Sequence, residues 1–97
     1  MEPHPEIIRF CTLLEELEAL LQDNDANFWA IKIGRCRRSA ENSDEWSVHC
    51  FLGLFGGMGS LNDLVLHQNG KPLGQENDKL HALLEKAWRV GKELVTG

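Results

Sequence analysis

A glycine-rich segment, residues 55–63, is the part of this sequence whose composition is best suited to holding a ligand. It reads Phe-Gly-Gly-Met-Gly-Ser-Leu-Asn-Asp and contains three of the nine glycines. Glycine loops that cradle phosphate follow the pattern Gly-x-Gly-x-x-Gly or end in Gly-Lys-Ser/Thr. Here Asn62 replaces the last glycine of the first pattern, and no lysine stands between Lys32 and Lys71. We therefore predict a tightly turned connector in which Ser60, Asn62 and Asp63 hydrogen-bond the neighbouring backbone.

Side chains suited to catalysis or metal binding are present, but their order and spacing match no known catalytic or metal-binding motif. The sequence has no Ser-His-Asp order, nucleophile elbow, His-Glu-x-x-His motif or paired carboxylates. We therefore predict no catalytic residues, no cofactor and no enzymatic turnover. The cysteines Cys11, Cys36 and Cys50 have no metal-ligand spacing, and we expect three small buried hydrophobic side chains. A zinc site would need a fourth ligand, such as His49 or His67, brought in by folding.

The distribution of charge points to a partner class. The 97 residues carry a formal net charge of −5, and residues 1–24 contain six acidic side chains against one arginine. Residues 25–39 reverse this excess, and residues 40–63 are acidic again. An acidic protein is repelled by phosphate backbones, so nucleic acid is an unlikely partner, whereas a basic protein fits. The predicted binding residues are Glu15 and Glu18 on the exposed side of the first helix, Asp44, Glu45, Asn62 and Asp63.

Small size, acidity and the lack of catalytic motifs favour a binding function. We expect a non-catalytic protein that binds a basic protein partner, most simply an immunity or inhibitor protein that neutralises a toxin. The alternative is a small-ligand or nucleotide-binding module that uses the glycine-rich segment with Arg35, Arg37 and Arg38. That basic cluster is explained more simply by its place at the negative end of a helix dipole. A homo-oligomer formed through the first helix is a third possibility.

Two helices are well defined by their apolar spacing. The first is predicted at residues 5–22, with Pro5 in the first turn and apolar side chains three or four positions apart on one face. The last is predicted to begin at Asn77 or Asp78 and to end near residue 95. Between them, Asn69-Gly70 is a strong two-residue turn signal and predicts a hairpin at residues 64–73.

The two central segments allow either a helix or a strand. In residues 28–36, Trp29 and Ile33 fit a helical stripe as well as strand alternation. Residues 46–55 alternate as in a strand, but the intervening positions are apolar too. The periodicity leaves both segments open. We expect Trp29, Trp46 and Trp88 to anchor the core, and an exposed tryptophan would indicate an interface.

The glycine-rich segment and the start of the last helix also carry a resemblance to a known family. The run from Phe55 to Leu66, Phe-Gly-Gly-Met-Gly-Ser-Leu-Asn-Asp-Leu-Val-Leu, precedes an Asn77-Asp78 pair that opens a Leu-rich terminal helix. Over about residues 10–95 the chain resembles a small bacterial family known as a domain of unknown function. The resemblance implies a bacterial source and helices before the glycine-rich segment, which favours a helix in residues 44–55. It implies no activity.

Together these features predict the fold class. We expect a single mostly α (α+β) domain over residues 1–97: a small bundle of about four helices, with a short β-hairpin after the glycine-rich segment. Every apolar run is shorter than the roughly 18 residues that a membrane span requires. The N-terminus is acidic and proline-rich, unlike a basic signal peptide, so we expect a cytoplasmic protein.

Overall fold

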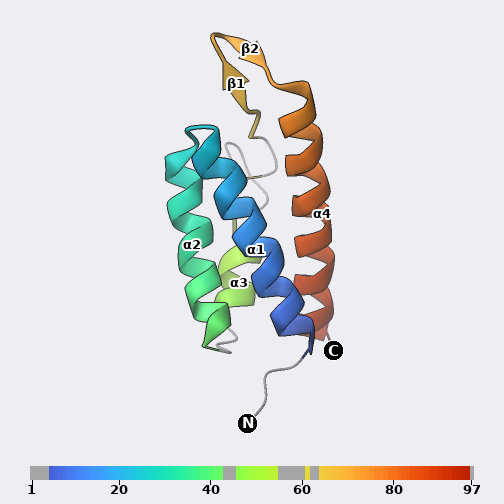
Figure 1. Ribbon diagram of the computed structural model, residues 1–97. Coiled ribbons are helices and arrows are strands. Elements are labelled where there is room, and N and C mark those ends of the chain that lie inside the picture. Colours follow the sequence, from blue (N-terminus) through green and yellow to red (C-terminus); the bar gives the residue numbers. More distant parts are fainter. Residues whose placement is uncertain (1–4, 43–45, 55–60, 62–63, 97) are drawn as a thin grey trace.

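The protein is a helical bundle with a small β-hairpin at one end (Figure 1). A computed structural model describes residues 5–42, 46–54, 61 and 64–96. Helix α1 lies between α2 and α4, and the shorter α3 packs on α2 and α4 behind it. The elements, in chain order, are α1 (Pro5–Asp23), α2 (Asn27–Glu41), α3 (Trp46–Leu52), β1 (His67–Gln68), β2 (Lys71–Pro72) and α4 (Gly74–Thr96). This confirms the predicted mostly α fold with a hairpin.

The corner between α1 and α2 is made by capping at the end of α1. The Nδ2 of Asn24 donates to the carbonyl of Leu20, and the Ala26 amide donates to the carbonyl of Leu21. Asp25 takes a left-handed conformation with φ of 61°. Ala26, and none of the polar residues 23–25, is the N-cap of α2, and it makes no side-chain cap bond. The polar residues serve to end α1 instead.

Both ambiguous central segments form helices, and the second is followed by a turn at residues 53–54. Residues 28–36 lie within α2, and residues 46–52 form α3. Ala30, Ile33 and Cys36 are buried on the inner side of α2, which is a helical spacing. The strand alternative would have placed Ile31 on the same face as Ile33, but Ile31 is 58% exposed. The family resemblance therefore favoured the correct structure for α3.

The core is formed by the inner faces of all the helices. The Phe10 and Phe51 rings meet edge to face, with centroids 5.4 Å apart, and link α1 to α3. The core side chains with no exposed surface are Phe10, Leu14, Leu17, Leu21, Ile33, Cys36, Phe51, Leu61, Leu80 and Ala87. The expectation that all three tryptophans anchor the core is wrong. Trp46 is 53% exposed and Trp88 is 41% exposed, because smaller aliphatic and phenyl side chains fill the interior.

The hairpin turns at the predicted position. Asn69 and Gly70 have φ of 55° and 78°, as a type I′ turn requires, and His67 pairs with Pro72. The strands are shorter than the predicted 64–73. Leu66 does not extend β1, because its amide donates to the Oδ1 of Asn77. Its carbonyl accepts from the Nδ2 of Asn77 and from the Leu73 amide across the hairpin.

The last helix begins earlier than predicted. Helix α4 starts at Gly74, and the Asn77 amide already donates to the carbonyl of Leu73, within the first helical turn. Asn77 is therefore inside the helix, and its side chain ties the start of the hairpin to α4. No helix in the described part of the chain is long and apolar enough to cross a membrane.

Candidate functional site

The structure describes two of the six predicted binding residues, Glu15 and Glu18. Glu15 is exposed on α1, as predicted. The prediction that Glu18 lies on the exposed side of α1 is wrong. Its side chain lies on the flank of α1 that faces α2, and only 18% of it is exposed. The other four predicted residues, Asp44, Glu45, Asn62 and Asp63, lie outside the described residues.

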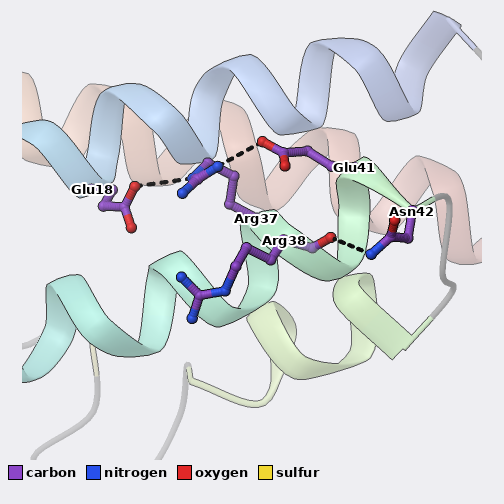
Figure 2. Close-up of polar contacts among 5 residues, drawn as sticks. All are labelled: Glu18, Arg37, Arg38, Glu41 and Asn42. Atoms are coloured by element: carbon purple, nitrogen blue, oxygen red, sulfur yellow. Dashed lines mark hydrogen bonds and ion pairs between the residues drawn. The ribbon is translucent and has the colours of Figure 1, made fainter.

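Glu18 belongs to an ion-pair network between α1 and α2 (Figure 2). The guanidinium of Arg37 lies between two carboxylates, with its Nε 3.0 Å from the Oε1 of Glu18 and one Nη 2.6 Å from the Oε1 of Glu41. The hydrogen bond to Glu41, with a smaller contribution from Glu18, raises the pKa of Arg37 above its ordinary value. Arg37 is therefore held as a fixed cation whose charge is compensated within the protein.

This network removes one arginine from the basic cluster, Arg35, Arg37 and Arg38, that the alternative ligand site would use. Arg37 is committed to Glu18 and Glu41, so it is not free to hold a phosphate. Arg35 and Arg38 are exposed and form no ion pair with a described residue. In Figure 2 no ion pair joins the Arg38 guanidinium to Glu18 or Glu41, and the Arg38 backbone carbonyl accepts a bond from Asn42. One of the three arginines is therefore already engaged inside the protein.

A close approach of the backbone explains why Glu18 lies where it does. Gly34 faces Glu18 across the α1–α2 contact, and a Cβ on Gly34 would overlap the Oε2 of Glu18. The missing side chain leaves the space that the carboxylate occupies. Glycine within a helix costs about 1 kcal/mol relative to alanine. Here the glycine accommodates the Glu18–Arg37 pair.

We expect Gly34→Ala to change stability in a way that depends on Glu18. In the natural sequence, alanine would displace the Glu18 carboxylate, and the loss of the ion pair would offset the helix-propensity gain of about 1 kcal/mol. In a Glu18→Ala background, the same change should stabilise the protein by about 0.5–1 kcal/mol, because the obstructing carboxylate is gone. Urea denaturation of the four variants measures this coupling.

Gly91→Ala is the matched control for this cycle. Gly91 also lies inside a helix, but the nearest atoms to a Cβ there would be those of the Leu52 and Phe10 side chains, at 3.4 Å or more. Its effect should be the same with and without Glu18. If Gly34→Ala also gives the same effect in both backgrounds, Glu18 does not need the space beside Gly34.

The exposed surface of α1 carries three carboxylates outside these internal pairs. Glu15, Glu16 and Asp23 are exposed and form no ion pair with a described residue. Glu16 and Asp23 are seven positions apart, two helical turns, so they share one side of the helix. We call these three residues the α1 acidic ridge. Sequence reasoning identified Glu15 but passed over the other two, whose signal was spacing along an exposed helical face.

The exposed face of the neighbouring helix has a different character. Phe28 and Ile31 are 66% and 58% exposed, and the Nζ of Lys32 lies 4.9 Å from the centre of the Phe28 ring. With Arg35 and Arg38 this face is apolar and basic. Adjacent helices thus present surfaces of opposite charge.

Two of the three cysteines are brought together by folding. The Sγ of Cys36 on α2 lies 2.8 Å from the Sγ of Cys50 on α3, and both are free thiols. Cys36 is buried as predicted, whereas Cys11 and Cys50 are half-buried. Within the described ranges, no three His, Cys, Asp or Glu side chains are grouped to hold a metal ion. Sequence reasoning missed the thiol pair, because the two residues belong to different helices and no local pattern joins them.

Comparison with known proteins gives one match. A family model described as "Domain of unknown function (DUF6966)" matches residues 22–74, more than half of the 97 residues. The matched segment runs from the end of α1 through α2, α3 and the hairpin to the start of α4. No curated protein and no solved structure gives a significant match.

Proposed function

Because the chain belongs to DUF6966, a family of unknown function, its role must follow from its own surfaces, and we propose that it is a non-catalytic protein that binds a basic protein partner through the α1 acidic ridge. The observation that carries this proposal is the ridge itself. Its three carboxylates are exposed, and within the described residues none is compensated by an ion pair.

The distribution of internal ion pairs supports this choice. Glu18 and Glu41 compensate Arg37, and Glu85 pairs with Arg89 on α4. The ridge carboxylates make no such pair with the described residues, so their field extends into solvent. An uncompensated charged surface speeds the approach of an oppositely charged partner and selects against partners of like charge.

The partner class follows from the sign of this field. A ridge of carboxylates repels nucleic acid phosphates and attracts lysine- and arginine-rich protein surfaces. Nuclease active sites are such surfaces, because they are positively charged in order to hold nucleic acid. We therefore propose an immunity or inhibitor function in the bacterial cytoplasm, with the ridge covering a basic site on a toxin.

Charge reversal on α1 tests the proposal. The variant Glu15→Lys/Glu16→Lys should slow association with the partner by about tenfold and weaken its dependence on salt. The measurement is affinity capture at low salt with the natural protein as bait. Surface plasmon resonance against each captured protein then follows, over a series of salt concentrations.

A matched variant on α4 separates a specific site from general attraction between opposite charges. Asp78 and Glu93 are exposed on α4 and form no ion pair with a described residue, so Asp78→Lys/Glu93→Lys changes the net charge by the same amount. Association should stay close to that of the natural protein. Equal slowing by both variants, or recovery of only neutral and acidic proteins, would contradict the proposed ridge site.

A further inference from the structure

Two thiols from separate helices lie almost within bonding distance. The Sγ atoms of Cys36 and Cys50 are 2.8 Å apart, and a disulfide bond is about 2.05 Å long. We infer that this pair is an oxidation site at which a hydroperoxide forms an intramolecular disulfide between α2 and α3. The inference concerns a surface and a chemistry separate from the α1 acidic ridge.

The surroundings of the two thiols give them different roles. Cys36 has no exposed surface, and burial, together with its hydrogen bond to Cys50, raises its pKa. Cys50 is half-buried, so its sulfur is the one that a small oxidant in solvent reaches first. Cys36 then supplies the second sulfur from inside the protein. In this arrangement one thiol is oxidised first and the neighbouring thiol resolves it into a disulfide.

The chemistry balances with hydrogen peroxide as the oxidant. The Cys50 thiolate attacks one peroxide oxygen, the O–O bond breaks and the departing hydroxide takes a proton to become water, which leaves Cys50 as a sulfenic acid. The Cys36 sulfur then attacks the Cys50 sulfur, loses its proton and displaces a second water. Two thiols and one peroxide give one disulfide and two waters. A dithiol reductant reverses the change.

The third cysteine provides a reference inside the same molecule. Cys11 lies on α1, outside the pair, and burial with the nearby Glu41 and Glu15 carboxylates raises its pKa. A raised pKa lowers the thiolate fraction and therefore the rate of oxidation. Cys11 should remain a free thiol when Cys36 and Cys50 are joined.

Peroxide treatment of the reduced full-length chain tests the inference. After unfolding, the number of alkylatable thiols should fall from three to one, and the mass should fall by about 2 Da. Digestion should give a Cys36–Cys50 cross-linked peptide, and the protein should stay monomeric on a non-reducing gel. The cross-link closes a short loop, so the melting temperature should rise by about 10 °C.

Two variants make the result specific. Cys11→Ser keeps the pair and should form the disulfide at the natural rate. Cys50→Ser removes the accessible sulfur, so Cys36 should stay reduced in the folded protein, as shown by alkylation after unfolding. Three alkylatable thiols after peroxide treatment that fully oxidises free cysteine would overturn the inference. So would a disulfide that contains Cys11 or joins two chains.

Discussion

Phe10→Ala should lower the free energy of unfolding by about 3–5 kcal/mol, the largest effect we expect from a single substitution in this protein. The Phe10 ring has no exposed surface and meets Phe51 edge to face at an interplanar angle of 83°. The ring also lies beside Gly91 of α4, so this one side chain of α1 packs against both α3 and α4. Removing it leaves a cavity that α1, α3 and α4 cannot all close.

Phe28→Ala is the matched control, because it makes the same substitution on the surface. Phe28 is 66% exposed, and its contacts are the neighbouring Trp29 ring and Lys32. Its replacement should change stability by less than about 1 kcal/mol. Urea denaturation of both variants, with the m-value checked for constancy, gives the comparison. Equal losses for the two variants would mean that Phe10 is not a central core residue.

Asn77→Ala should lower the free energy of unfolding by about 2 kcal/mol, because it leaves a buried backbone amide without its partner. The Leu66 amide donates to the Oδ1 of Asn77 at 2.7 Å, and Leu66 is only 2% exposed. The Leu66 carbonyl is less affected, since it also accepts from the Leu73 amide. The cost therefore comes mainly from the single unpaired amide.

Hydrogen exchange shows whether this bond holds the hairpin to α4. In the natural protein the Leu66 amide should be protected, and in Asn77→Ala it should exchange much faster, while amides in the middle of α1 keep their protection. Asn42→Ala is the control, because Asn42 is exposed and its side chain bonds only the Arg38 carbonyl among the described residues. Unchanged protection of Leu66 would contradict the assigned role of Asn77.

The sequence determined the elements whose signals are local. Helix α1 follows from apolar residues at three- and four-residue spacing, and its observed span, Pro5–Asp23, ends one residue beyond the prediction. The Asn69-Gly70 turn follows from the left-handed conformation that both residues adopt readily. These outcomes depend on neighbours in the chain, so residue types and spacing are enough to predict them.

Tertiary structure decided what depends on distant partners. Trp29 and Ile33 satisfy two periodicities, and only packing against α1 and α3 selects the helix that exposes Ile31. Glu18 was expected in solvent but faces α2, because Gly34 leaves room for its carboxylate beside Arg37.

The thiol pair and the role of Asn77 depend on the same kind of contact. Cys36 meets Cys50 fourteen positions away, and Asn77 bonds a backbone eleven positions away. An asparagine before an apolar stripe predicts a helix cap from sequence, and the two cysteines match no motif. Periodicity records which side of an element is apolar, but it does not record which element will lie against it. That choice is made by packing the whole chain, which is why these contacts were visible only in the folded protein.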